Sequence, residues 1–178
     1  MISMLQKCGF TIALIAMISC SGCKNEELQV LAEIPFRVEF EIPAGINVVE
    51  DHFFRFTNLL NNYENILTQR GVAAERIQRI NPGTARMTVL FDDTPLGFIQ
   101  EASIYLFSDE VGRQSEAFWT PQIPLNQSSI LNIPGTLIDA SDFFDYDRIH
   151  MEVRLDTRQV PTSFITVRLD VTYHAMGE

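Results

Sequence analysis

Residues 34–42 read Ile34-Pro35-Phe36-Arg37-Val38-Glu39-Phe40-Glu41-Ile42. Every even position is apolar and the odd positions from 37 to 41 are charged, which is the period of two expected of a β-strand with one buried and one exposed face. Pro35 lies near the start of this strand, where a missing N–H group costs least. The segment Pro43-Ala44-Gly45 ends it.

The same alternation recurs along the chain, and Pro/Gly turns separate the segments. It predicts strands at Ala85–Phe91, Phe98–Phe107, Ser115–Leu125, Ile130–Ile133, 149–155 and 165–175. Ala73–Ile80 is expected to add a helical turn that Asn81-Pro82-Gly83 stops. Seven or eight half-exposed strands predict a mainly β domain, an antiparallel two-sheet β-sandwich of immunoglobulin-like or jelly-roll-like type. A closed β-barrel is the alternative.

One segment has helical spacing instead. Its apolar residues recur every three or four positions, which predicts an inserted α-helix around residues 51–70, from Asp51 to Arg70-Gly71. The helix would pack on the sandwich, or it would present a partner-binding face. An irregular insertion is the third reading, because four asparagines in the segment are poor helix formers. The candidate partner-binding residues are Phe53, Phe54, Phe56, Leu59, Leu60, Tyr63 and Leu67.

The N-terminus has the pattern of a secretory signal. Lys7 precedes an apolar run, Gly9–Ile18, and small residues then lead to Cys23. A run of about ten apolar residues is too short for a membrane span, which needs roughly 20.

This signal resembles that of a bacterial lipoprotein. Ser21 and Gly22 match the small residues before the cleavage site, and Cys23 matches the cysteine that receives diacylglycerol and becomes the mature N-terminus. The position three before Cys23, commonly a branched aliphatic residue, is Cys20, which is also the alternative lipidation site. An ordinary signal of a secreted protein is the other interpretation.

The resemblance implies a cleaved signal peptide at 1–22, a lipidated tether at 23–32 and a single sandwich domain at 33–178. It implies attachment to the outer membrane of a Gram-negative cell, on the periplasmic face or the cell surface. The pair Glu26-Glu27 resembles the acidic tracts that direct some such lipoproteins to the surface.

Charge and cysteine content exclude several classes of function. Without Lys7 the mature chain has 12 of the 13 basic residues against 23 acidic ones, a net charge of about −11. Such a balance argues against nucleic acid and against anionic lipid headgroups as partners. The three cysteines, Cys8, Cys20 and Cys23, all precede the domain, so it holds no disulfide and no thiol nucleophile.

Signals for chemistry are weak. No nucleophile elbow, phosphate loop or zinc-protease motif occurs, and no cofactor is expected. Four clustered carboxylates could offer oxygen ligands to Ca²⁺. They lack the glycine turn and terminal glutamate of an EF-hand loop, and capping of a helical turn is the preferred reading. The four are Asp139, Asp142, Asp145 and Asp147.

Aromatic residues give the other binding signal. Phe118 and Trp119 are adjacent on a predicted strand, so their side chains should point to opposite faces of the sheet. An exposed Trp119 with Tyr105 nearby could form a platform for stacking a sugar.

Together these patterns predict a membrane-anchored lipoprotein that serves as a non-catalytic structural or accessory subunit of an outer-membrane complex. It would dock to a protein partner in the cell envelope through the helix face or a sheet edge. The alternatives are a glycan or small-ligand binding module and, third, an enzyme whose acids and histidine converge only in the fold.

Overall fold

The computed structural model describes residues 28–178 except 110 and 113, so Cys20 and Cys23 lie outside the described residues. These residues form eight strands, two short α-helices and two 3₁₀ turns. The strands are β1 (Gln29–Ile42), β2 (His52–Leu60), β3 (Ile77–Val89), β4 (Ile99–Phe107), β5 (Gln114–Thr120), β6 (Ile130–Pro134), β7 (Arg148–Thr157) and β8 (Ile165–Gly177). The helices are α2 (Tyr63–Arg70) and α3 (Ser141–Phe144), and the 3₁₀ turns are η1 (Ala74–Arg76) and η2 (Leu96–Phe98).

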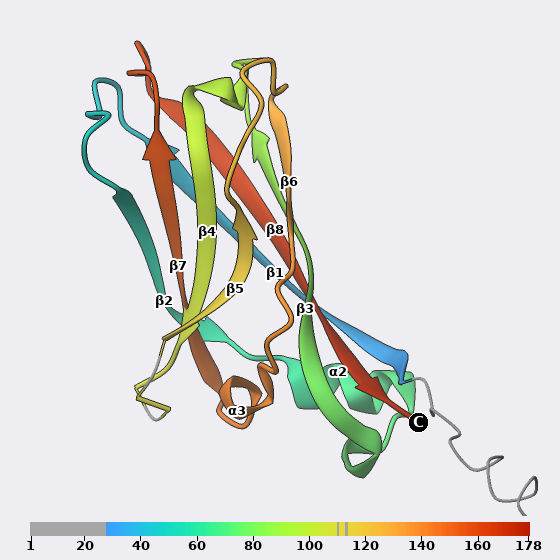
Figure 1. The fold of residues 1–178 in the computed structure, drawn as a ribbon. Coiled ribbons are helices and arrows are strands. Elements are labelled where there is room, and N and C mark those ends of the chain that lie inside the picture. Colours follow the sequence, from blue (N-terminus) through green and yellow to red (C-terminus); the bar gives the residue numbers. More distant parts are fainter. Residues whose placement is uncertain (1–27, 110, 113) are drawn as a thin grey trace, which may run out of the picture.

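The strands form two antiparallel sheets of four, in the orders β1-β8-β3-β6 and β2-β7-β4-β5 (Figure 1). The first strand pairs with the last, the second with the second-last, and so inward to the hairpin β4–β5. A long hairpin rolled up in this way is a jelly roll. The predicted β-sandwich is confirmed, and the barrel alternative is wrong because the two sheets stay separate, joined by an isolated bridge between Phe118 and Gly135.

The core lies between the sheets and follows from the alternating pattern. In β8 the odd positions from Ile165 to Ala175 are buried and the even positions are half-buried. An aromatic cluster in the interior includes Tyr173, and the ring centroids of Phe36, Phe118 and Phe144 lie 5.2–6.0 Å from that of Tyr173. Each such buried side chain contributes about 1.5–3 kcal/mol, which stabilises a domain without disulfides.

The predicted helix at 51–70 is wrong in its first half. Residues 52–60 form strand β2, in which His52, Phe54 and Phe56 point inward while Phe53 and Arg55 point outward. Aromatic residues favour strands, and pairing with β7 overrides the helical spacing. The second half is the helix α2, which ends as predicted, with Gly71 in the left-handed conformation.

Three boundaries also differ from the expectation. Asn81-Pro82-Gly83 lies inside β3, because a register shift between Pro82 and Thr84 accommodates the proline without breaking the strand. Phe91 lies in the loop after β3, although the predicted strand Ala85–Phe91 ended with it. Residues 29–32, assigned to the tether, belong to β1.

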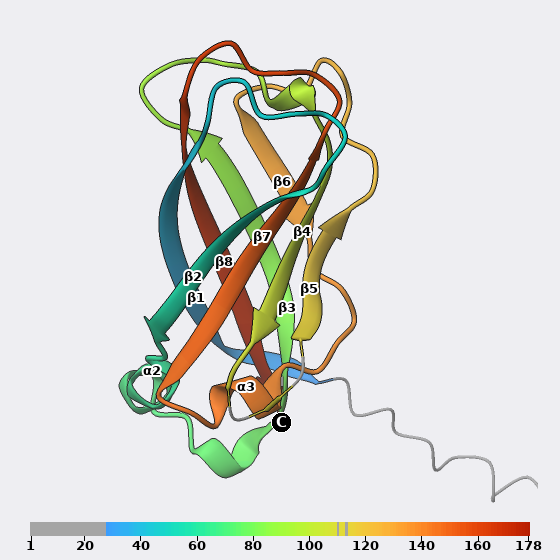
Figure 2. The same cartoon turned by 90° about the vertical axis from the view of Figure 1, so that its left-hand side faces the viewer.

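The sandwich has two unlike ends (Figures 1 and 2). The helices α2 and α3, the start of β1 and the C-terminus lie at one end, which we call the helical end. The loops β1–β2, β3–β4, β5–β6 and β7–β8 lie together at the other, the loop end. Among the described residues, no helix has the length and apolar character that crossing a bilayer requires.

Candidate functional site

The structure does not gather the seven predicted partner-binding residues on one helix face. Phe53, Phe54, Phe56, Leu59 and Leu60 lie on β2, and their side chains alternate between the core and the solvent. Leu67 is buried in α2, with Tyr63 half-buried beside the core. The predicted face therefore separates into core residues and two exposed ones, Phe53 and Leu60.

The four aspartates proposed as calcium ligands do not converge either. Within residues 28–178, apart from the two not described, no group of three or more His, Cys, Asp or Glu side chains lies close enough to hold a metal ion. Asp139 Oδ1 accepts hydrogen bonds from Ser141 N (3.0 Å) and Oγ (2.6 Å) and from Ile80 N (3.3 Å). Partial burial raises the pKa of Asp139, but these bonds and the nearby Arg79 prevail and lower it. Its carboxylate serves the local fold.

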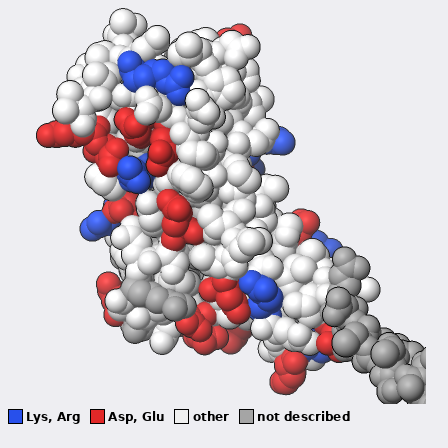
Figure 3. All heavy atoms as spheres, viewed as in Figure 1, with Lys and Arg blue, Asp and Glu red and all other residues white. Residues whose placement is uncertain are grey.

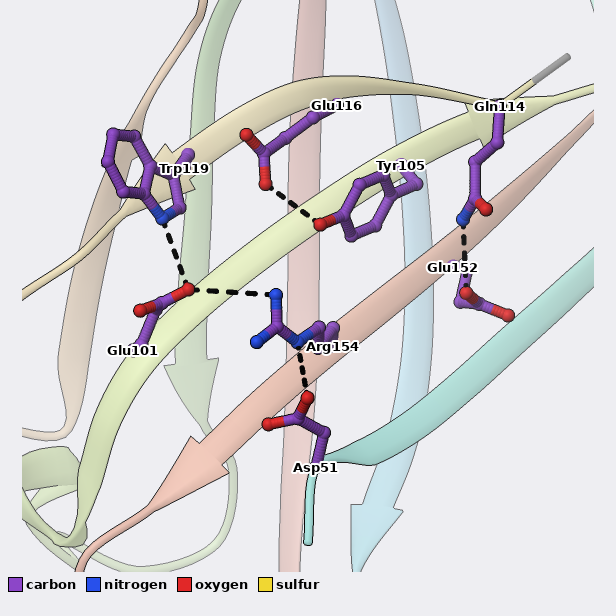
Figure 4. Close-up of polar contacts among 8 residues, drawn as sticks. All are labelled: Asp51, Glu101, Tyr105, Gln114, Glu116, Trp119, Glu152 and Arg154. Carbon is purple, nitrogen blue, oxygen red and sulfur yellow. Dashed lines mark hydrogen bonds and ion pairs between the residues drawn. The ribbon is translucent and has the colours of Figure 1, made fainter.

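Phe118 and Trp119 do point to opposite faces, as predicted. Phe118 is fully buried between the sheets, whereas Trp119 is 42 % exposed on the outer face of the sheet β2-β7-β4-β5. The indole Nε1–H donates to Glu101 Oε1 at 3.2 Å, which fixes the ring (Figure 4). Tyr105 lies on the same face, and its hydroxyl donates to Glu116 Oε1 at 2.9 Å.

Arg154 connects the Trp119–Glu101 pair to Asp51, which directly precedes β2. Its Nε donates to Asp51 Oδ2 at 2.8 Å, and its Nη1 lies 3.7 Å from Glu101 Oε1. A chain of contacts therefore runs from Trp119 through Glu101 and Arg154 to Asp51 (Figure 4). The hydrogen bonds with Asp51 and Tyr105 raise the pKa of Arg154 further, so the guanidinium is permanently charged.

A second group of contacts surrounds Glu152, which is 5 % exposed. Arg55 Nε and Nη2 donate to Glu152 Oε2 at 2.8 and 2.6 Å, and Gln114 Nε2 donates to Oε1 at 3.1 Å. The Arg55 guanidinium also lies over the Phe107 ring, 5.3 Å from its centroid. Both carboxylate oxygens are thus engaged by the protein.

The one histidine buried on this face has a structural role. The His150 ring stacks on Phe107 at 5.1 Å, and its Nδ1 accepts a hydrogen bond from the Asn58 backbone N–H at 3.1 Å. Its Nε2 lies 3.8 Å from Asp109 Oδ2. The contact with Asn58 holds that residue at φ = 58°, where β2 shifts register against β7. The imidazole therefore acts as a fixed acceptor in the fold.

The opposite outer face carries a hollow of about 920 Å³. Arg37 and Arg168 both pair there with Asp170, and Arg86 Nε donates to Asn132 Oδ1 at 3.1 Å. The polar groups along this hollow are largely bonded to one another, as solvated ion pairs on a sheet commonly are.

The loop end has a different character. Six large apolar side chains are exposed there, and they come from all four loops. Phe91 is 94 %, Val49 89 % and Leu125 67 % exposed. In the space-filling view the tip of this end is mainly uncharged, a basic patch lies just below it, and acidic atoms lie on its left side and again toward the helical end (Figure 3). We call the six residues the apolar crown; they are Val48, Val49, Phe91, Leu125, Val160 and Phe164.

Hydrogen bonds between the loops make the crown rigid. Gly45 N donates to Pro161 O at 2.9 Å, and Arg158 Nη2 donates to Ile123 O at 2.7 Å. Asn47 Oδ1 accepts from the backbone N–H groups of Val49 and Glu50, both at 2.9 Å, and so shapes the β1–β2 loop. The exposed side chains are therefore presented by a fixed backbone.

Phe91 also has a strained backbone. Its φ is 72°, in the left-handed region, which costs an L-residue about 1–2 kcal/mol. A phenylalanine that is both strained and almost fully exposed contributes little to folding. Such outliers concentrate at functional positions.

Sequence patterns did not reveal the crown, because each of its residues is a single apolar side chain within a turn. The signal was that apolar residues interrupt four turns, as in Phe91-Asp92-Asp93 and Pro124-Leu125. Only the topology shows that these four turns meet at one end.

No family model and no curated protein matches the chain. Among solved structures, the crystal structure of the decameric BFDV capsid protein has a TM-score of 0.36 and 9 % sequence identity, over 82 % of this chain and 96 % of that chain. A likeness at this level supports no conclusion about function.

Proposed function

We propose that this protein is a lipid-anchored, non-catalytic accessory subunit of a complex in the cell envelope, and that it binds its protein partner through the apolar crown. The crown is the observation that carries the proposal. Exposed apolar groups that gather at one place and are rimmed by polar residues mark interaction sites. Asp92, Asp93 and Glu50 supply an acidic rim, so the partner should offer an apolar centre with basic residues around it.

The distance from the proposed anchor favours a protein over the anchoring membrane as the occupant. The six residues from Cys23 to Gln29 reach at most about 20 Å, and Gln29 lies at the helical end. The 14-residue strand β1 then spans up to about 45 Å toward the loop end. An upright domain therefore holds the crown well away from the bilayer. The acidic rim also disfavours anionic headgroups.

The crown is large enough to support specific binding. Burying an apolar side chain contributes about 1.5–3 kcal/mol, and somewhat less for those that are already half-covered. Six such side chains offset the loss of translational and rotational freedom on association. The rigid loops reduce the further cost of ordering the interface.

The test is a mild-detergent pull-down of the tagged full-length protein from its native envelope, read by mass spectrometry. The crown variant is Val49→Ser with Leu125→Ser. The control is Leu137→Ser, because Leu137 is 95 % exposed but follows β6, away from the four loops of the crown. A Cys23→Ala chain tests the anchor, and flotation with liposomes tests direct lipid binding.

We expect one stoichiometric protein that is retained by wild type and by Leu137→Ser and is lost with the crown variant. The Cys23→Ala chain should leave the membrane fraction. If the crown variant retains the same proteins as wild type, the crown does not bind the partner. Flotation of the Cys23→Ala chain that depends on the crown would assign this surface to lipid instead.

A further inference from the structure

The strand register aligns four side chains straight across the outer face of the sheet β2-β7-β4-β5. Phe53 of β2 pairs with Arg154 of β7, Arg154 with Ser103 of β4, and Ser103 with Trp119 of β5. Paired residues share a face. We call these four residues the Phe53–Trp119 row, and this face is turned toward the viewer in Figure 2.

An exposed aromatic ring stands at each end of the row. Phe53 is 58 % and Trp119 42 % exposed. Three strand spacings of about 4.8 Å separate them, so the two rings lie about 14 Å apart along the row. Aromatic faces pack against apolar C–H surface, and two rings at this separation match a short oligosaccharide better than a single sugar or a small apolar ligand.

Polar groups lie between the two rings. Arg154 and Glu101 occupy the middle, and Asp51 lies beyond Arg154 (Figure 4). Side chains of this kind pair with sugar hydroxyls, which both donate and accept. The Ser103 hydroxyl, in the row itself, is fully buried and has no hydrogen-bond partner among the described residues. Such a group costs free energy unless a water or a ligand satisfies it.

The charge of the face selects the class of glycan. Asp51, Glu101, Glu116 and Glu152 outnumber Arg55 and Arg154 around the row. An acidic polysaccharide would meet net repulsion. The hydrogen bond from Trp119 to Glu101 and the ion pairs of Arg154 hold the site in place before any ligand arrives, which lowers the cost of binding.

We propose that the Phe53–Trp119 row binds a neutral oligosaccharide along the outer face of this sheet. The site is separate from the apolar crown. The outer face of the sheet would then bind a glycan of the envelope or the surroundings, while the loop end binds a protein.

The experiment uses the fluorescence of Trp119, the single tryptophan of the chain. The Cys23→Ala chain is titrated with neutral trisaccharides built from glucose, mannose, galactose, xylose and N-acetylglucosamine, and with trigalacturonic acid as the acidic comparison. Emission and protection from iodide quenching report occupancy at the row. Calorimetry then measures affinity independently of the fluorophore.

We expect saturable binding of at least one neutral trisaccharide and none of trigalacturonic acid. Phe53→Ala should lower the affinity about 5-fold or more, since it removes the aromatic contact about 14 Å from the reporter. Leu60→Ala is the matched control, because Leu60 lies on the same strand with similar exposure, 57 %, but outside the row. It should change nothing, and the crown variant should bind the sugar like wild type.

Three results would overturn the inference. These are no binding across the neutral panel, equal binding of trigalacturonic acid, or an affinity that Phe53→Ala and Leu60→Ala change alike. None of them bears on the crown, whose partner is measured separately.

Discussion

Replacing Phe91 by asparagine separates the stability of the domain from its binding. Phe91 has φ = 72° and is 94 % exposed, so its side chain contributes almost no burial to the isolated domain. Asparagine tolerates the left-handed conformation far better than phenylalanine does. Phe91→Asn therefore relieves most of a strain of about 1–2 kcal/mol and should raise the free energy of unfolding by about 1 kcal/mol.

Urea denaturation of the Cys23→Ala chain measures this change. With a slope of about 2 kcal/mol per molar urea, an increase of 1 kcal/mol moves the midpoint up by about 0.5 M with no change in slope. The melting temperature should rise by about 2–4 °C. Phe164→Asn is the control. Phe164 belongs to the same crown but does not have a positive φ, so its replacement should not stabilise the domain.

The same substitution should weaken binding of the envelope partner. A fully buried phenylalanine contributes about 1.5–3 kcal/mol, which corresponds to a loss of roughly 10-fold to 150-fold in affinity. Stability and binding thus move in opposite directions, as expected of a residue kept for function. If Phe91→Asn destabilises the isolated domain, the side chain is packed in the fold and the reasoning fails.

Three further substitutions test the fold around these surfaces. Gly97→Ala places a Cβ 2.0 Å from the Leu125 carbonyl oxygen. It should lower the free energy of unfolding by about 1–3 kcal/mol, measured as a lower melting temperature. An unchanged melting temperature would mean that the β5–β6 loop does not pack against Gly97. Tyr173→Phe removes a buried hydroxyl without a partner among the described residues and should raise stability by about 1 kcal/mol. Burial raises the pKa of Tyr173, so the folded state binds more protons than the unfolded state above about pH 10, and wild type should lose stability as the pH rises there. Urea titrations at pH 9 and 11 should show that Tyr173→Phe loses less, and equal losses would contradict this. Asp139→Ala should lower the free energy of unfolding in urea by about 1–2 kcal/mol, because it removes the hydrogen-bond acceptor for Ser141 and Ile80. EDTA should leave the melting temperature of the wild type unchanged. A shift with EDTA would support the calcium hypothesis instead.

The period of two in the sequence was enough to predict the sandwich. Strands such as β1 and β8 have one face fully apolar, and a register error of one residue would expose the whole of it. The segment 52–60 misled because Phe53, Phe56 and Leu60 also have helical spacing. Pairing with β7 decided its structure, and pairing between distant segments is not encoded in local spacing.

The candidate sites were less predictable for the same reason. Trp119 was identified because it is adjacent to Phe118 on one strand, so one of the two side chains had to point away from the core. Phe53 belongs to the same site only through the cross-strand register, which spans residues 53, 154, 103 and 119. The apolar crown likewise depends on four loops that the jelly-roll order brings to one end.

The most direct test of the proposed function is site-specific photo-cross-linking in intact cells. A photoreactive amino acid replaces Val49 in the crown of the full-length protein. The comparison chain carries it in place of Leu137, which is 95 % exposed against 89 % for Val49 and lies outside the crown. We predict one discrete protein adduct from position 49 that disappears with Leu125→Ser, and no such adduct from position 137. Equal adducts from the two positions, or none from position 49, would contradict the proposal that the crown is the docking surface.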